Sequence, residues 1–181
     1  MPLEQAIARR RSRRYFKAEP LSLEEIGQLL WSAQGVTSEE GLRAAPSAGA
    51  MYPLETYLAC AEGLFQYLPQ EHSVVKKSAE DPRPPLAKAA LGQDFIAQAA
   101  VSVIFTAVYQ RTTGRYGERG RRYVHMDAGY AAENVHLQAE ALGLGSVSVG
   151  AFDDAAVARV LGLSRDEEPL LIIPAGRLDK A

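Results

Sequence analysis

The longest helical pattern in this chain lies in the stretch RYVHMDAGYAAENVHLQAEALGLGSVSVGAF, residues 122–152. Apolar and small residues recur there at steps of three or four, which predicts a helix over residues 122–142 with one buried stripe. Gly143 and Gly145 should end the helix, and the β-branched run after them predicts a strand over 146–152. Because the glycines lead from a helix into a strand, their order is the reverse of the Rossmann dinucleotide turn.

Outward from this stretch, helical and strand patterns alternate irregularly. We expect helices over residues 2–10, 21–35, 85–100 (with a break near Gly92) and 154–162, strands over 54–61, 64–68, 101–109 and 169–176, and loops over 41–55 and 111–120. In the second helix, Ser22 and Glu25 have the spacing of a capping box. The strands and helices show no regular βαβ rhythm, so we predict an α+β fold in a single domain over residues 1–181.

Composition excludes several classes of function. The formal net charge is -2, which argues against general nucleic-acid binding, and no run approaches the roughly 20 apolar residues of a membrane span. Cys60 is the sole cysteine, so an internal disulfide is impossible and a cytoplasmic location is expected. His72, His125 and His136 are scattered without a partner at ligand spacing, and we therefore predict no metal site.

Five arginines crowd into residues 9–14 of this nearly neutral chain. They fit a disordered basic arm, a nucleic-acid patch, a solvated basic helix end, or a site for one anionic ligand. Under the last interpretation, guanidinium forks and a hydroxyl would hold a phosphate; the residues that supply them are Arg10, Arg11, Ser12 and Arg14. No serine elbow or acid–base pair is apparent, which favours chemistry that belongs to a bound cofactor.

Several motifs then resemble one family. The segments AIARRRSRRYF (6–16) and RAAPSAGAMYPLETYLA (43–59) are similar to signatures of the nitroreductase superfamily, the second most of all to its SagB-type, azoline-oxidising dehydrogenase branch. Further matches are GLFQYLPQEHSV (63–74), LGQDFIAQAAVSVIFTAV (91–108), RYGERGRRYVHMDAGYAAENVHLQAEALGLGSVSVGAFDD (115–154) and PLLIIPAGR (169–177). The matches follow the family's order over nearly the whole chain, although Asp127 and Tyr130 stand where the branch often has Glu and His.

The resemblance implies a nitroreductase-like fold, with a mixed or antiparallel central sheet flanked by helices, and a homodimer with two FMN molecules at its interface. By matching position, Arg10, Arg11 and Ser12 approach the phosphate and ribityl chain, Arg14 the pyrimidine, Gln93 the ribityl or ring edge, and Gly150 and Ala151 the surroundings of flavin N5. Gly176 and Arg177 close the phosphate site, and the partner subunit supplies Pro46, Ser47, Ala48 and Gly49. No catalytic side chain is expected.

The resemblance also implies a reaction. NADH or NADPH would deliver hydride to the flavin, and a nitroaromatic, a quinone or another conjugated acceptor would collect it in a ping-pong cycle. The first alternative is a dehydrogenase that oxidises azoline rings in a modified peptide. A non-catalytic flavin-binding protein is the alternative from another class. We expect no nucleic-acid or membrane partner.

Overall fold

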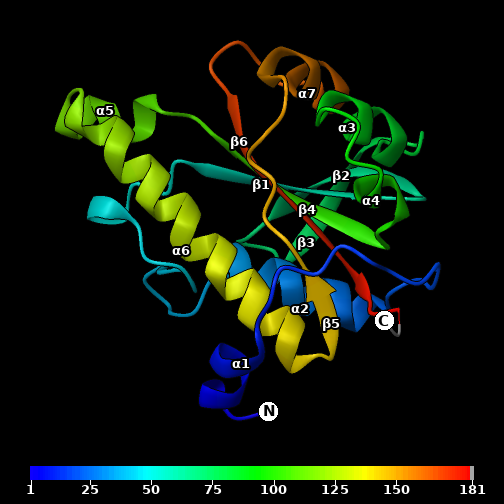
Figure 1. The fold of residues 1–181 in the computed structure, drawn as a ribbon. Coiled ribbons are helices and arrows are strands. Elements are labelled where there is room, and N and C mark those ends of the chain that lie inside the picture. The colour runs from blue at the N-terminus through cyan, green and yellow to red at the C-terminus, as the bar shows by residue number, and fades with distance from the viewer. Residues whose placement is uncertain (180–181) are drawn as a thin grey trace.

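The computed structural model describes residues 1–179, and its centre is a six-stranded sheet. The strands lie in the order β3-β2-β1-β4-β6-β5, and every neighbouring pair is antiparallel (Figure 1). Their bounds are β1 Leu54–Cys60, β2 Gly63–Leu68, β3 Ser73–Ser78, β4 Val101–Ala107, β5 Leu144–Ser146 and β6 Glu168–Arg177. The sheet and its helices confirm the predicted α+β fold.

Helices cover both faces of this sheet. Their bounds are α1 Leu3–Arg9, α2 Leu23–Gln34, α3 Arg83–Ala89, α4 Phe95–Gln98, α5 Gln110–Tyr116, α6 Arg119–Ala141 and α7 Asp154–Leu161, with a 3₁₀ turn η1 at Ala48–Ala50. Helices α2 and α6 pack on one face, and α3, α4 and α7 pack on the other (Figure 1). Side chains alternate between the faces along each strand, so Leu58 and Val103 join the first layer while Tyr57 and Ile104 join the second.

Helix α2 begins where the sequence predicts. The Ser22 side chain accepts a hydrogen bond from the backbone N–H of Glu25, and the Glu25 carboxylate accepts one from the backbone N–H of Ser22. This reciprocal capping box satisfies two donors that the helix cannot use internally. Gly35 follows the helix as its C-cap, and its N–H donates to the carbonyl of Trp31.

Helix α6 confirms the predicted buried stripe. Val124, Ala131, Val135 and Ala139 have no exposed surface and lie in the core against the sheet. The helix starts at Arg119, a few residues before the predicted start. It runs diagonally from α5 to β5 along one side of the sheet, so residues at its two ends contact different parts of the molecule (Figure 1).

Three elements differ from the sequence predictions. The predicted loop at 111–120 is wrong, because α5 forms there and packs on α6. Strand β3 is a largely exposed edge strand that the sequence did not indicate. The predicted strand over 146–152 is also wrong: β5 ends at Ser146, and only an isolated bridge from Val149 to Ile172 continues the pairing. Within residues 1–179, no helix has the length and apolar character that crossing a bilayer requires.

Candidate functional site

The arginine-rich segment is held against the edge of the sheet. Ser12 forms a parallel bridge with Ser146 of β5, and the backbone N–H of Arg13 donates to the Ser146 carbonyl at 2.9 Å. The segment is therefore an ordered part of the fold, with a defined side toward the sheet and another toward solvent. This placement excludes the disordered basic arm.

The arginine-rich segment and the backbone near Ala151 both contact the segment that joins α3 to the start of α4. The Arg14 guanidinium lies over the Phe95 ring, 5.8 Å from its centroid. The Gln93 side chain donates to the carbonyl of Ala151 at 3.1 Å, which ties the α3–α4 turn to the chain after β5. We call the combined surface of residues 10–14, 93–95 and 148–151 the strip. It joins three stretches that are far apart in the sequence.

The strip presents cationic donors to solvent. Arg10 forms an ion pair with Glu133 of α6 at 3.5 Å, and its side chain remains about one-third exposed. The Arg11 guanidinium donates to the carbonyls of Ala8 at 3.1 Å and Arg10 at 2.7 Å through one nitrogen. A guanidinium has five N–H donors, so Arg11 keeps donors for an anion. Two exposed positions of the strip, Gly150 and Ala151, lie near its other end.

The buried side chain of His136 is hydrogen-bonded to the strip. The two ring nitrogens of His136 are hydrogen-bonded to Ser146 Oγ at 2.8 Å and to Ser148 Oγ at 2.7 Å. Burial, with a smaller contribution from the Arg10 charge, lowers the pKa of His136 to about 4. The ring is therefore neutral at pH 7, and its two hydrogen bonds hold Ser146 and Ser148 in place. The sequence alone assigned His136 no role at the site.

The small-residue loop lies elsewhere in the same chain. Ser47 Oγ donates to Asp127 Oδ2 at 2.7 Å, and the backbone N–H of Ala48 donates to Oδ1 at 3.3 Å. Asp127 and His136 are nine residues apart on one helix, which corresponds to about 14 Å along its axis. The two features therefore contact different turns of α6. The other predicted loop residues are Pro46 and Gly49, and both are exposed.

Gly176 and Arg177, which were predicted to close the phosphate site, lie at the end of β6 and contact residues of their own chain. Gly176 is buried, and a Cβ there would lie 3.2 Å from the Phe16 ring and from the backbone nitrogen of Ala100. Arg177 pairs with Glu25 at 3.0 Å and with Glu19 at 3.7 Å. Its charge is already partly compensated, so an anionic ligand would compete with two carboxylates.

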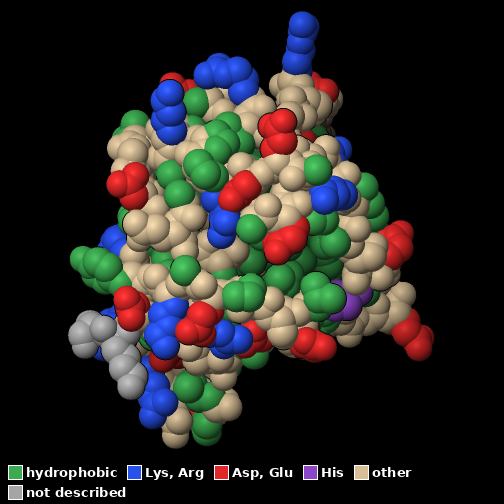
Figure 2. Space-filling model, turned by 90° about the vertical axis from the view of Figure 1, so that its right-hand side faces the viewer, with side chains coloured by type: hydrophobic (Ala, Val, Ile, Leu, Met, Phe, Trp, Pro, Cys, Tyr) green, Lys and Arg blue, Asp and Glu red, His purple; other side chains and the backbone are tan. Residues whose placement is uncertain are grey.

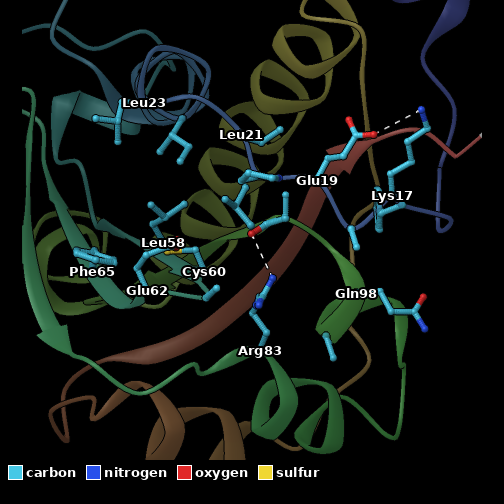
Figure 3. A pocket seen from close by; sticks show the side chains of 18 of the residues that line it. Lys17, Glu19, Leu21, Leu23, Leu58, Cys60, Glu62, Phe65, Arg83 and Gln98 are labelled. Atoms are coloured by element: carbon cyan, nitrogen blue, oxygen red, sulfur yellow. Dashed lines mark hydrogen bonds and ion pairs between the residues drawn. The ribbon is translucent and has the colours of Figure 1, made fainter.

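A cavity of about 660 Å³ lies between the start of α2, the β1–β2 turn and α4, and no strip residue lines it (Figure 3). Its lining is mainly apolar, and none of the predicted flavin contacts belongs to it. Lys17 pairs with Glu19 at its rim, at 3.8 Å. On the molecular face in Figure 2, hydrophobic side chains likewise lie between charged groups of both signs.

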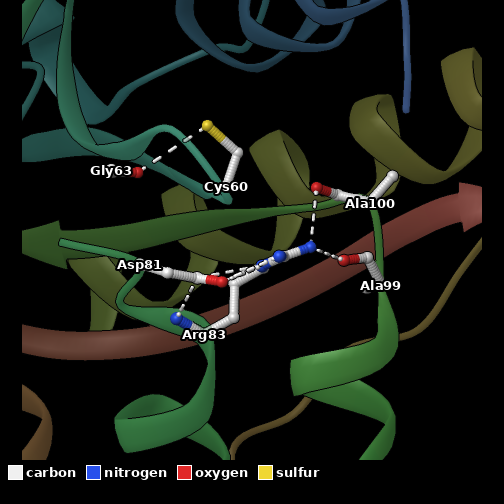
Figure 4. A network of polar contacts seen from close by, with 6 residues as sticks. All are labelled: Cys60, Gly63, Asp81, Arg83, Ala99 and Ala100. Carbon is white, nitrogen blue, oxygen red and sulfur yellow. Dashed lines mark hydrogen bonds and ion pairs between the residues drawn. The ribbon is translucent and has the colours of Figure 1, made fainter. Parts of the chain in front are cut away.

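The cations of this cavity are already engaged. Arg83 binds both carboxylate oxygens of Asp81 and donates to the carbonyls of Ala99 and Ala100 (Figure 4). Burial raises the pKa of the Cys60 thiol to about 11, which keeps it protonated and unreactive. We therefore prefer the strip as the site for a phosphate-bearing ligand. No group of three or more His, Cys, Asp or Glu side chains suited to a metal ion occurs in the described part of the chain.

Comparison with known proteins gives one consistent family. Residues 7–177 match the family described as the nitroreductase family. A protein of Methanocaldococcus jannaschii, provisionally named a nitroreductase, is 47% identical over 181 residues, which cover 97% of this chain and 90% of that relative.

Solved structures have the same fold. A protein of Ralstonia eutropha JMP134, provisionally titled a nitroreductase, superposes with a TM-score of 0.91 at 33% identity. The match covers 100% of this chain and 85% of the Ralstonia chain. The NADPH:FMN oxidoreductase of Vibrio harveyi complexed with NAD⁺ superposes with a TM-score of 0.74 at 24% identity. That match covers 98% of this chain and 69% of the Vibrio chain. At this lower identity the likeness concerns the fold.

Proposed function

Because the chain belongs to the nitroreductase family and is an oxidoreductase, we propose that it uses FMN to pass hydride from NADH or NADPH to a small conjugated acceptor. Nitroaromatics and quinones are the acceptor classes we favour. The observation that carries the proposal is the strip, in which one folded surface joins the arginine segment, the Gln93 turn and the backbone around Gly150.

The residues of the strip fit a phosphorylated flavin. Arg10 and Arg11 leave guanidinium donors exposed beside Ser12, and charge-assisted bonds from such groups are the strong ones for a phosphate. FMN, when bound, supplies the hydride chemistry at N5, which no side chain of the protein could provide. Arg177 would add to phosphate binding only by giving up part of its pairing with Glu25 and Glu19.

The other end of the strip would orient the ring. Arg14 is held over Phe95, and a cation at the pyrimidine edge stabilises negative charge that develops there. Gln93 fixes the Ala151 carbonyl, so the backbone at 150–151 keeps one orientation. Gly150 carries no side chain that would obstruct a planar ring or a nicotinamide.

A homodimer would complete each site. In one chain, the loop at 46–49 contacts a different turn of α6 from the strip, so it fits a role at the partner's site. Helices α1, α2 and α6 also expose large apolar side chains that a second copy could cover, namely Leu3, Ile7, Trp31, Met126 and Tyr130. Exposed apolar surface of this kind commonly marks an interface.

The alternatives separate by experiment. Oxidation of azoline rings rests on the SagB-type resemblance alone, and the buried Asp127 and exposed Tyr130 replace the residues common in that branch. A non-catalytic flavin-binding protein would bind FMN but would not be reduced by a nicotinamide. A cytoplasmic location stays a prediction from composition.

Flavin identity tests the proposed cofactor. The purified protein, saturated with a mixture of FMN and FAD and then washed, should release FMN on denaturation, as resolved by chromatography. The arginine set is sized for a terminal phosphate, and the chain lacks a Rossmann turn for an adenylate. Release of FAD, or of no flavin, would defeat the proposal.

A further inference from the structure

The loop over residues 46–52 has an unusually strained backbone. Gly49 has a φ of 61°, Ala50 of 54° and Tyr52 of 45°. Left-handed conformations at residues other than glycine cost of order 1 kcal/mol or more each, and they persist where surrounding contacts impose them. Ala50 and Tyr52 are two such residues within three positions, so contacts with the rest of the protein must hold the loop in this conformation.

One carboxylate supplies that anchor. Asp127 is buried in the middle of α6 and accepts hydrogen bonds from Ser47 Oγ at 2.7 Å and from the backbone N–H of Ala48 at 3.3 Å. Ser47 Oγ in turn accepts from the backbone N–H of Tyr52 at 2.9 Å. The carboxylate therefore holds one end of the loop directly and the other end through a single hydroxyl.

Packing supports the same shape. A Cβ at Gly49 would lie 2.5 Å from Tyr116 Oη, so the loop is backed closely by α5. At its far end, the Tyr52 hydroxyl accepts from the backbone N–H of Arg43 at 3.2 Å, and the Arg43 guanidinium lies 4.5 Å from the Tyr52 ring centroid. Meanwhile Pro46, Gly49 and Ala50 remain exposed on the outer side.

We propose that Asp127 is a positioning residue, which holds loop 46–52 in its strained shape so that the loop presents its small residues to the flavin on the partner subunit's strip. The inference rests on the proposed function. A loop that is ordered before binding loses less conformational entropy when it contacts a ligand. A lesion at Asp127 should therefore weaken the flavin site of the other subunit and leave the strip of its own subunit intact.

The first test compares FMN binding among homodimers. Asp127→Asn removes the acceptor for the Ser47 hydroxyl, and Ser47→Ala removes the hydroxyl itself, so each should raise the Kd for FMN by about tenfold or more. Ser47→Thr keeps a hydroxyl at an extended residue (φ −137°, ψ 142°) and should restore binding. Asp166→Asn, the same change at an exposed site, should bind FMN as the wild type does.

The second test asks in which subunit Asp127 acts. A heterodimer is assembled from one Asp127→Asn chain and one chain with Arg11→Ala and Arg14→Ala, each with its own affinity tag. If Asp127 acts on the partner's site, the intact strip of the Asp127→Asn chain meets the intact loop of the arginine variant. The damaged strip of the arginine variant meets the damaged loop of the Asp127→Asn chain, so both lesions fall in one site. FMN titration should then show one site per heterodimer with wild-type affinity.

Other outcomes overturn the inference. If no site of the heterodimer has wild-type affinity, Asp127 acts within its own subunit. Wild-type affinity in both the Asp127→Asn and the Ser47→Ala homodimers would show that the network does not position the loop. If Asp127→Asn does not fold, Ser47→Ala replaces it in the heterodimer with the same expectations. Failure of the wild type to bind FMN, or normal binding by the arginine double variant, would instead overturn the proposed function.

Discussion

At the scale of single residues, Arg10 and Arg11 should recognise the phosphate of FMN and ignore its ring. Arg10→Ala and Arg11→Ala should each weaken FMN binding by about 10- to 150-fold, since a charge-assisted hydrogen bond contributes roughly 1.5 to 3 kcal/mol. Riboflavin has the same ring and ribityl chain without the phosphate, so its affinity should hardly change. Fluorescence titration of the apoprotein with both ligands measures the difference.

Arg9→Ala is the matched control, because this exposed arginine precedes the strip and has no assigned contact. Arg14→Ala should differ from all three variants by weakening both ligands, since Arg14 is expected to face the pyrimidine ring. Equal losses of FMN and riboflavin in Arg10→Ala would show that Arg10 supports the ring or the fold instead of the phosphate.

His136 should make stability depend on pH. Its folded pKa of about 4 lies below its unfolded value of 6.5, so the unfolded chain binds the proton more readily. The contribution of neutral His136 is complete above pH 6.5 and is lost as the pH falls toward 4. From pH 7 to pH 5 this one group should reduce the free energy of unfolding by about 2 kcal/mol.

Urea unfolding of wild type and His136→Asn at both pH values, at equal protein concentration, checks this prediction. The variant lacks the titrating ring, so the stability gap between the two proteins should narrow by about 2 kcal/mol at pH 5. A gap that is the same at both pH values would mean that His136 is not held neutral in the folded protein.

At the scale of elements, the capping box of α2 should be a measurable part of the stability. Ser22→Ala removes the acceptor for the Glu25 N–H and should lower the free energy of unfolding by about 1 kcal/mol. Ser22→Thr retains the hydroxyl and should lose less. Chemical unfolding monitored by circular dichroism makes the comparison, and equal stability of Ser22→Ala and wild type would contradict the assigned cap.

The elements that the sequence predicted correctly carry local signals. The capping box at Ser22, the apolar stripe of α6 and the glycine break at Gly92 each follow from short-range rules, and the structure confirms them. Strand β3 was missed because SVVKKS is mostly polar and lies exposed at the sheet edge. Helix α5 was missed because its glycine-bearing segment gains its stability from packing on α6, which no local pattern reveals.

The candidate site likewise contains residues that the sequence indicates and residues that only the fold reveals. Its arginines and small residues are proposed from motifs whose types and spacing resemble the family signature, and their contacts with a flavin stay a prediction. The supporting groups could not: Asp127 and His136 are nine residues apart on α6, and each acts on a segment brought to it by the fold. The buried carboxylate at Asp127 would have required knowledge that Ser47, 80 positions away, packs against it.

At the scale of the whole molecule, the protein should be an obligate homodimer. The strip and the loop contact different turns of α6, so a monomer would hold only part of each flavin site. Light scattering coupled to size exclusion should give twice the 19.6 kDa chain mass at micromolar and lower concentrations, with two FMN per dimer. Obligate interfaces commonly bury more than about 2,000 Å², so dilution should not separate the subunits. A monomer that retains FMN would contradict this expectation.

The central claim is that the protein passes hydride through a bound FMN, and anaerobic double-mixing stopped flow tests it most directly. FMN-loaded protein is mixed first with NADH or NADPH and then with a quinone or a nitroaromatic, while the flavin absorbance near 450 nm is followed. Our account predicts that at least one nicotinamide bleaches the flavin and that the acceptor restores its absorbance in the second mixing, with no need for both substrates together. A flavin that stays oxidised with both nicotinamides would contradict the account.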